Sequence, residues 1–371
     1  MITGGGTGGH TSPATAIIEE LQRRDPRLTL QWVGKRGNIE ERLCKRLSIP
    51  FRPVAISGWP RTPGPRKLWV GAQLAWSIAR SWFYIKRFEP GAVLGVGSYV
   101  SLPLMLAAQR MGVPTIIHEQ NKRLGMANAL LAPKAARVFL SYPETQGVYP
   151  EERAMVTGNP VRGRFLSPPT RAEACKALGL DPVLPVVLIT GGSQGARTLN
   201  HTVRDALPQF GKNELQLLWM TGSAFVPEAR AAAAQAPIRV DVFRYIDDMA
   251  TACAAADLIV SRAGASSTAE IAALGKPSIL VPYPFATDDH QTDNARALEG
   301  AGGAVAVPDG EFTPARFLLL THELLGDPAR LQAMGKAAHG MAKPGAAEAI
   351  AEAILETVFS GEADAAGAQA P

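Results

Sequence analysis

The sequence predicts an α/β protein of two Rossmann-like domains, each built on a parallel sheet, that face each other across a cleft. Continuous apolar runs alternate with helix-like stretches through both halves, as in βαβ units whose strands are buried on both faces. A turn of small residues follows the first predicted strand of each half, at Gly4–Gly9 and at Gly191–Ala196. With 371 residues, 46% of them hydrophobic, the chain is long enough to bury two cores.

The first half contains strand patterns separated by helical ones. Only Met1–Thr3 precede the first glycine turn, so a strand there would be unusually short. The other predicted strands are Leu28–Gly34, Ala92–Gly97, Pro114–Glu119 and Arg137–Ser141, and the predicted helices are Asn38–Leu47, Arg66–Phe88 and Leu102–Met111.

The second half repeats this plan, with helices expected between its strands. Ser167–Pro169 interrupts regular structure. We therefore expect one domain over residues 1–162 and a second over residues 163–345. A last helix at about Ala346–Phe359 is expected to pack back on the first domain, and residues 360–371 to form a disordered tail. The predicted strands of this half are Pro185–Gly191, Leu215–Thr221, Ile238–Phe243, Leu258–Ser261, Ser278–Tyr283 and Ala304–Val307.

Composition argues against several classes of protein. Cys44, Cys175 and Cys253 are far apart and lack C-x-x-C spacing, which disfavours a disulfide framework or a zinc site. No apolar run reaches the roughly 18 residues of a membrane span, and no signal peptide is recognisable. Residues 1–160 carry a net charge of +11 and residues 161–371 one of −6. The basic half suits an anionic partner, although a solvated surface would have the same composition.

Both glycine turns suit phosphate binding, because backbone N–H groups can approach a phosphate there and the next helix begins with a favourable dipole. Neither continues as Gly-Lys-Ser/Thr, so neither is a P-loop, and Gly4–Gly9 alone is a weak dinucleotide fingerprint. A tight turn needed only for packing is the alternative. No D-x-D pair is present, and the side chains of Asp247–Asp248 and Asp288–Asp289 need not converge, so we expect neither a metal site nor a cofactor.

Polar residues gather where two predicted elements of the first half begin or end. His10 closes the first glycine turn, where an imidazole can take a proton from an attacking hydroxyl or donate to a phosphate. His118–Asn121 follows an apolar strand, and Asn121 is the member that we expect to touch a ligand. The alternative for His118 and Glu119 is a hydrogen-bond network that only stabilises the loop.

In the second half, Ser261–Glu270 leads from an apolar strand into a helix. The start of that helix suits a phosphate, and Glu270 could accept two ribose hydroxyls or only cap the helix. Asp289–Gln291 offers donors and acceptors for the hydroxyls of a sugar.

These segments together resemble the MurG-type N-acetylglucosaminyltransferases of bacterial peptidoglycan synthesis. Any one motif is weak, but six in the same order and spacing are specific. The resemblance implies a GT-B fold and metal-independent, inverting transfer of N-acetylglucosamine from UDP-N-acetylglucosamine to the 4-hydroxyl of undecaprenyl-diphosphate-linked N-acetylmuramyl-pentapeptide. The matching pieces are Gly5–His10, His118–Asn121, Gly158–Arg162, Gly191–Ala196, Tyr245–Met249 and Arg262–Ala265.

The resemblance also implies the site residues. His10 resembles the family's candidate base, and the sequence does not separate it from Glu119. Ile246 would meet the uracil ring through its backbone. The residues that look like contacts of the UDP-sugar are Thr7, Gly8, Gly9, Asn121, Arg162, Ser193, Ile246, Ala265, Ser266, Ser267, Thr268, Ala269, Glu270 and Gln291.

A lipid-linked acceptor implies a peripheral protein at the cytoplasmic face of the cell membrane, on an anionic surface and beside other proteins of wall synthesis or division. Within Arg61–Phe88, basic residues accompany two apolar helix faces. One face carries Trp69, Trp76 and Phe83, and the other runs from Leu68 to Trp82. We expect one face to pack on the sheet and the other to contact lipid.

Three rival activities would use similar parts. A UDP-sugar 2-epimerase shares the two-domain architecture but needs several acidic groups for elimination, for which Glu119 is the main candidate. A dinucleotide-dependent dehydrogenase would have to bind NAD. A non-enzymatic module for nucleotide sugars or nucleic acid would suit the basic first half, but no aromatic platform for bases is recognisable, so we expect no nucleic-acid partner.

Overall fold

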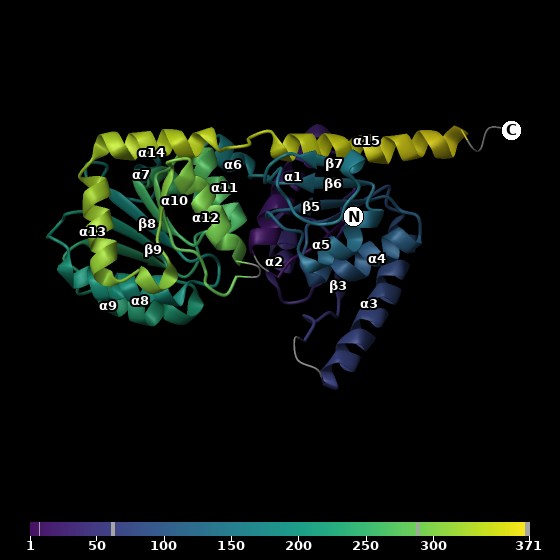
Figure 1. Cartoon of the computed structure of the whole chain (residues 1–371), viewed down its shortest axis with the longest axis horizontal. Coiled ribbons are helices and arrows are strands. Elements are labelled where there is room, and N and C mark those ends of the chain that lie inside the picture. Colours follow the sequence, from purple (N-terminus) through teal and green to yellow (C-terminus); the bar gives the residue numbers. More distant parts are fainter. Residues whose placement is uncertain (7, 61–63, 287–288, 368–371) are drawn as a thin grey trace. The chain divides into compact units, whose positions relative to one another are not determined.

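The structure, a computed structural model, describes residues 1–6, 8–60, 64–286 and 289–367, with the backbone alone in 360–367. The chain divides into two compact units. Unit 1 contains Met1–Arg162 and the chain from Gly345 onward, and unit 2 contains Gly163–Pro344. Each unit is a parallel sheet with helices packed on its faces (Figure 1), so the predicted pair of Rossmann-like parallel sheets is confirmed.

The sheet of unit 1 has seven parallel strands in the order β3-β2-β1-β4-β5-β6-β7. β1 is only two residues long, yet it pairs with both β2 and β4. The edge strands β3 and β7 were not predicted, because they are short and β3 contains Pro53, which weakens a strand pattern. The strands are β1 (Ile2–Thr3), β2 (Trp32–Lys35), β3 (Phe51–Val54), β4 (Val93–Gly95), β5 (Thr115–Glu119), β6 (Arg137–Leu140) and β7 (Ala154–Val156).

Apolar residues on both faces of this sheet form the core of unit 1. One cluster lies around Val93, Leu104 and Ile117, and the other around Ile17, Trp32 and Ile354. The helices are α1 (Gly8–Arg24), α2 (Ile39–Arg46), α3 (Arg66–Phe88), α4 (Leu102–Arg110), α5 (Met126–Leu131) and α15 (Ala346–Gly367), with short 3-10 helices η1 (Tyr99–Ser101), η2 (Ala132–Lys134) and η3 (Glu151–Arg153).

The last helix, α15, packs along α1 in unit 1 (Figure 1). Ile350 and Ile354 are buried in the same cluster as Ile17, and Glu348 accepts a hydrogen bond of 2.8 Å from Arg24 Nη2. The helix continues to Gly367, beyond the expected end at 359, because the alanine-rich sequence there favours helix. The expected disordered tail is therefore helical as far as Gly367, and its residues 368–371 lie outside the described residues.

The sheet of unit 2 has six parallel strands in the order β10-β9-β8-β11-β12-β13, around one apolar core that includes Leu199, Trp219 and Phe317. The strands are β8 (Val186–Thr190), β9 (Gln216–Met220), β10 (Arg239–Phe243), β11 (Leu258–Ser261), β12 (Ser278–Leu280) and β13 (Ala304–Ala306). The helices are α6 (Gly163–Leu166), α7 (Arg171–Ala177), α8 (Arg197–Ala206), α9 (Val226–Ala233), α10 (Met249–Ala255), α11 (Ala265–Leu274), α12 (His290–Gly300), α13 (Pro314–Leu325) and α14 (Pro328–Gly340), with 3-10 helices η4 (Leu207–Gln209), η5 (Ser223–Phe225) and η7 (Asp309–Glu311).

Within the part of the chain that the structure describes, no helix is both long enough and apolar enough to cross a bilayer.

Candidate functional site

Each sheet has one topological switch point, where successive strands are laid down on opposite sides of the first. In unit 1 it lies between β1 and β4, and in unit 2 between β8 and β11. Ligands of open α/β sheets bind outside the carboxyl ends of the strands at such points. The two glycine loops follow β1 and β8, so each lies at the switch point of its own sheet.

The first glycine loop requires its glycines for two reasons. Gly4, Gly5 and Gly6 all have positive φ, where side chains are disfavoured. A Cβ on Gly4 would also lie 2.4 Å from Val96 Cγ2, and one on Gly5 would lie 2.4 Å from the carboxyl carbon of Glu40. Thr7 lies outside the described residues.

Glu40, in the first turn of α2, holds this loop. Its side chain is fully buried, and its carboxylate accepts hydrogen bonds from the backbone N–H of Gly6 at 3.2 Å and of Lys35 at 3.1 Å. The Gly6 N–H is therefore occupied by protein. This residue was missed in the sequence, where the only available signal was an acidic residue in the helix after the second strand.

His10 lies in the first turn of α1, at the switch point of unit 1. It is half-buried, and its ring packs against Gly97, just beyond β4: a Cβ on Gly97 would lie 3.0 Å from His10 Cδ2 and 3.4 Å from Nε2. Gly8 has open space around its Cα, and Gly9 is exposed. The start of α1 is thus accessible, with an imidazole beside it.

Glu119, at the end of β5, is buried and accepts four hydrogen bonds. Oε1 accepts from the backbone N–H and the side-chain amide of Asn121, both at 3.0 Å. Oε2 accepts from Gly125 N and Asn128 Nδ2, both at 2.9 Å. Burial raises the pKa of the Glu119 carboxyl, although these donors oppose the shift. Glu119 thus fixes the position of Asn121.

His118 is fully buried next to this cluster. Its Nδ1 accepts from Gln120 Nε2 at 3.0 Å, so Nε2 carries the proton and donates to Gly158 O at 3.3 Å. Burial lowers the pKa of His118 to about 4, so the ring is neutral at pH 7. The bond joins β5 to the segment that ends at Arg162, a half-buried residue at the end of unit 1.

The second glycine loop is packed backbone against backbone. A Cβ on Gly195 would lie 1.9 Å from Thr221 O, and one on Gly222 would lie 2.2 Å from Gln194 O. The loop therefore lies directly on the chain that leaves β9. Ser193, half-buried within this loop, precedes α8.

The predicted contacts at 265–270 form the first turns of α11, which follows β11. Thr268 is occupied, since its hydroxyl donates to Gly264 O and Ala265 O at 3.2 and 3.1 Å. Glu270 is half-buried. Of the others, Ala265 and Ser266 are buried, and Ser267 and Ala269 are half-buried.

Two other residues that were predicted to contact the UDP-sugar already form hydrogen bonds within the protein. The N–H of Ile246 donates to Met220 Sδ at 3.3 Å, a weak acceptor. Gln291, in the first turn of α12, accepts from Tyr283 N through Oε1 at 3.0 Å, which leaves its NH2 group as the available donor.

The structure also places one of the two adjacent aspartate pairs. Asp248 caps α10 through Thr251 and forms an ion pair of 2.9 Å with Arg164. Asp288 lies outside the described residues. In the described ranges, no group of three or more His, Cys, Asp or Glu side chains is arranged to hold a metal ion.

Two family models match the chain. Residues 1–140 match the glycosyltransferase family 28 N-terminal domain, and residues 186–350 match the glycosyltransferase family 28 C-terminal domain.

The chain is also similar to curated proteins and solved structures. It is 38% identical over 369 residues to the UDP-N-acetylglucosamine–N-acetylmuramyl-(pentapeptide) pyrophosphoryl-undecaprenol N-acetylglucosamine transferase of Desulforudis audaxviator, covering 97% of this chain and 99% of the relative. The protein of the same name from Xanthomonas axonopodis pv. citri is 40% identical, with 97% and 82% covered. The crystal structure of Acinetobacter baumannii MurG aligns with a TM-score of 0.74 at 31% identity, covering 96% and 98%. A UDP-GlcNAc 2-epimerase from Neisseria meningitidis aligns at 15% identity and a TM-score of 0.65, which shows a shared fold alone.

Proposed function

The chain belongs to glycosyltransferase family 28 and, within it, to the UDP-N-acetylglucosamine–N-acetylmuramyl-(pentapeptide) pyrophosphoryl-undecaprenol N-acetylglucosamine transferases, and we propose that it catalyses this transfer in peptidoglycan synthesis. The observation that supports the proposal most is identity of 38–40% to relatives of that name over nearly the whole chain. The epimerase alternative has only the fold in its favour, at 15% identity.

Unit 2 is the proposed donor site. The loop at Ser193 and the start of α11 present backbone N–H groups at one switch point, an arrangement that suits a diphosphate. Glu270 is half-buried one turn into α11, where a carboxylate can accept two ribose hydroxyls. From unit 1, Gly8, Gly9, Asn121 and Arg162 are further proposed contacts of the UDP-sugar, and Thr7 is proposed from sequence alone.

The donor is proposed to react without a metal ion. Charge that develops on the departing diphosphate would be met by the N–H groups of the loop, by the positive end of the α11 dipole and by Arg162. The loop and the start of α11 belong to the same unit and are in place before the reaction, so they need little reorganisation.

Unit 1 is the proposed acceptor site, with His10 as the general base. Its imidazole would take the proton of the acceptor 4-hydroxyl as the hydroxyl oxygen attacks the anomeric carbon and UDP departs, inverting that carbon. We favour His10 over Glu119 because the Glu119 carboxylate is 2% exposed and already accepts four hydrogen bonds, whereas His10 is half-buried at the switch point.

We further propose that α3 contacts an anionic membrane surface, where a lipid-linked acceptor would be found. The expectation that one of its two apolar faces packs on the sheet is wrong, because Leu68, Trp82 and Trp76 are all exposed. The buried face is instead a third one, which contains Val70, Ser77 and Ser81. At 100° per residue, the exposed apolar residues span an arc of about 140°.

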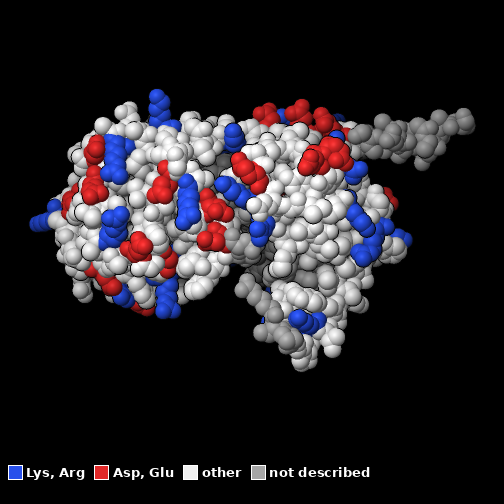
Figure 2. Space-filling view, in the orientation of Figure 1, with Lys and Arg blue, Asp and Glu red and all other residues white. Residues whose placement is uncertain are grey.

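The charges on α3 also suit such a surface. The helix contains five Lys and Arg residues and no acidic one. Its N-terminal end projects from unit 1 (Figure 1), and in Figure 2 the charged side chains visible there are basic. Attraction of this kind contributes about 1 kcal/mol per basic residue near anionic lipid. We propose a peripheral location at the cytoplasmic membrane face, with other wall-synthesis or division proteins nearby.

A transfer assay tests the proposed function. The purified protein is incubated with radiolabelled UDP-N-acetylglucosamine and a short-chain lipid-diphosphate N-acetylmuramyl-pentapeptide, and the labelled lipid product is separated from the donor. We expect product formation that depends on the acceptor and persists in EDTA. Conversion of the donor to its 2-epimer without acceptor would instead support the epimerase, and a magnesium-reversible loss in EDTA would contradict the metal-free mechanism.

A further inference from the structure

Asp309 lies in unit 2, far in sequence from both segments that flank the donor site. It begins η7, directly beyond the carboxyl end of the edge strand β13. One carboxylate oxygen, Oδ2, accepts a hydrogen bond of 2.9 Å from the hydroxyl of Thr198. Thr198 lies in the first turn of α8, immediately after the glycine loop that contains Ser193.

The other oxygen, Oδ1, accepts a hydrogen bond from Arg262 and forms an ion pair with it. Arg262 directly follows β11 and precedes the start of α11. Its side chain is 10% exposed, so it needs an anionic partner to offset the loss of water. The same Nη1 also donates to the carbonyl oxygens of Val281 and Pro282 at 3.1 and 3.0 Å.

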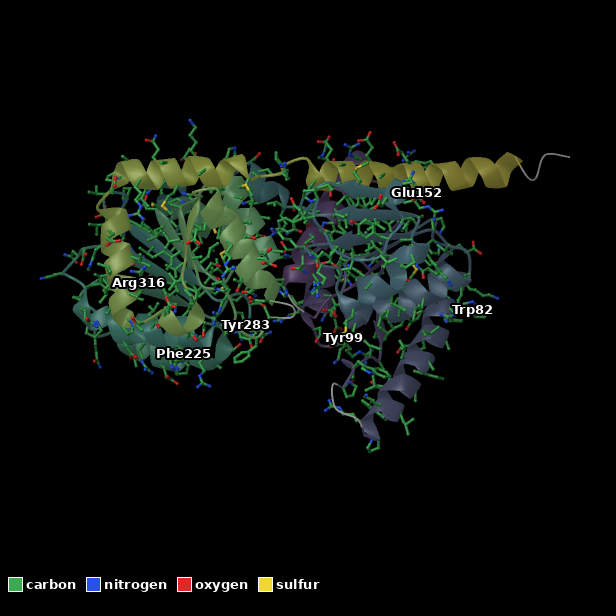
Figure 3. All side chains as sticks on the ribbon, viewed as in Figure 1. Trp82, Tyr99, Glu152, Phe225, Tyr283 and Arg316 are labelled. Atoms are coloured by element: carbon green, nitrogen blue, oxygen red, sulfur yellow. The ribbon has the colours of Figure 1, made fainter. Side chains whose placement is uncertain are left out.

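These contacts continue to the segment that meets Gln291. The Arg262 guanidinium lies 5.6 Å from the centre of the Tyr283 ring, labelled in Figure 3. The N–H of Tyr283 in turn donates to Gln291 Oε1. The buried Arg262 side chain thus holds the segment that follows β12 as well as the segment that follows β11.

The strand order of the sheet explains why Asp309 can contact both segments of the donor site. β8, β11, β12 and β13 are consecutive neighbours, and the switch point lies between β8 and β11. Asp309, which follows β13, bonds to one residue on each side of that switch point: Thr198 after β8 and Arg262 after β11. The two halves of the donor site, the glycine loop before α8 and the start of α11, are therefore tied to the same carboxylate.

We propose that Asp309 is a positioning residue of the donor site, which holds the glycine loop through Thr198 and the start of α11 through Arg262 in the geometry that binds a nucleoside diphosphate. The assignment rests on the proposed function, since it takes unit 2 to be the UDP-sugar site. Asp309 itself touches no substrate in this assignment.

The test measures the affinity of the full-length protein for UDP by calorimetry, together with donor and acceptor KM. Asp309→Asn keeps the size of the side chain but leaves Arg262 without its anion. We expect it to raise the UDP Kd and the donor KM about tenfold, with the acceptor KM unchanged. Thr198→Val should raise the UDP Kd by about threefold to tenfold, and Thr198→Ser, which keeps the hydroxyl, should restore it.

The double variant Asp309→Ala with Thr198→Val should bind UDP no more weakly than Asp309→Ala alone, because removal of the carboxylate already breaks its bond to Thr198. Asp257→Asn is the matched control. Asp257 forms an ion pair of 2.7 Å with Arg171 in the same unit, but bonds to Val186 N at the opposite, amino-terminal end of β8. It should lower Tm and leave the UDP Kd unchanged.

Parent-like UDP affinity in Asp309→Asn would overturn the assignment. An equal loss of affinity in Asp257→Asn would also overturn it, because lower stability would then explain both results. A parent protein that does not bind UDP at all would overturn the proposed donor site, and this assignment with it.

Discussion

The glycine loop of unit 1 is held by a hydrogen bond to a buried side chain, whereas the glycine loop of unit 2 is packed against the backbone of the neighbouring segment. In unit 1 the buried Glu40 carboxylate accepts the N–H of Gly6. In unit 2 a Cβ on Gly195 would meet the backbone carbonyl oxygen of Thr221. The two loops lie at equivalent switch points of their sheets. The same topology can therefore be stabilised by different interactions around the loop.

The residues that follow the loops differ as well. The first loop leads into α1 with His10, a titratable side chain, while the second leads through Ala196 into α8. We infer a division of labour in which unit 1 supplies the group that moves a proton and unit 2 supplies a rigid surface for the nucleotide. Five variants test this difference between the units.

The largest effect is expected from Gly195→Ala. The new Cβ would lie 1.9 Å from Thr221 O, and φ is +77°, so the backbone of the loop must move. We expect a loss of more than about 4 kcal/mol in the free energy of unfolding, or no UDP binding, measured by urea unfolding and calorimetry. Gly192→Ala is the control: φ is +80° but nothing lies within 4 Å, so only about 1–3 kcal/mol of strain is expected. Equal effects would show that backbone packing does not support this loop.

His10→Ala tests whether chemistry belongs to unit 1. Loss of a general base lowers kcat by about 10²–10⁴-fold, while the UDP Kd measured by calorimetry should barely change. Glu119→Gln is the comparison, since it should weaken UDP binding through the misplaced Asn121. A near-parent kcat in His10→Ala would remove the proposed base.

We expect the buried His118 to make the stability of unit 1 depend on pH. Its folded pKa, about 4, lies below the ordinary 6.5, so its contribution is complete above pH 6.5 and is lost as pH falls towards 4. The loss amounts to about 3 kcal/mol. His118→Gln should therefore flatten the decline in unfolding free energy between pH 7 and pH 4, measured by urea unfolding. A variant that keeps the full decline would show that another group causes it.

Glu40→Gln tests the support of the first loop. One carboxylate oxygen becomes an NH2 group that faces a backbone N–H, so we expect a loss of about 1–3 kcal/mol in the free energy of unfolding and a raised acceptor KM. UDP affinity should fall much less than acceptor affinity, because most of the proposed nucleotide contacts lie in unit 2. Glu41→Gln, on the same helix but bonded to Gly37 N instead, is the control and should keep the acceptor KM. If both variants behave alike, Glu40 does not act through the loop.

The sequence predicted the fold well because the signals are local. Buried strands such as Val186–Thr190 are continuous apolar runs, and β1 was located by the glycine turn that follows it, despite its two residues. The edge strands were missed because a short edge strand carries little pattern.

The residues that hold the two glycine loops in place could not be predicted from the sequence, because no local pattern marks them. Glu40 follows Gly6 by 34 residues, and Asp309 follows Thr198 by 111, so their contacts exist only after the sheets form. In the sequence both look like ordinary acidic residues at helix starts. The two apolar faces of α3 were recognised, but their exposure depends on where Ser77 and Ser81 lie against the rest of unit 1.

The smallest effect on stability is expected from Trp69→Ser with Trp76→Ser, the variant that tests α3. Both side chains are largely exposed, 56% and 64%, so their removal should leave Tm and the UDP Kd close to those of the parent. Co-sedimentation with vesicles rich in an anionic phospholipid should nevertheless fall several-fold, because buried aromatic area at the membrane surface is lost.

Val183→Ser is the control, since Val183 is 85% exposed in unit 2 and its substitution should not affect vesicle binding. Added salt should weaken binding of the parent, because the basic residues of α3 act through screened charge. Vesicle binding that is unchanged in the double variant, or equally reduced in the control, would show that α3 is not the membrane contact and that unit 1 does not differ from unit 2 in this respect.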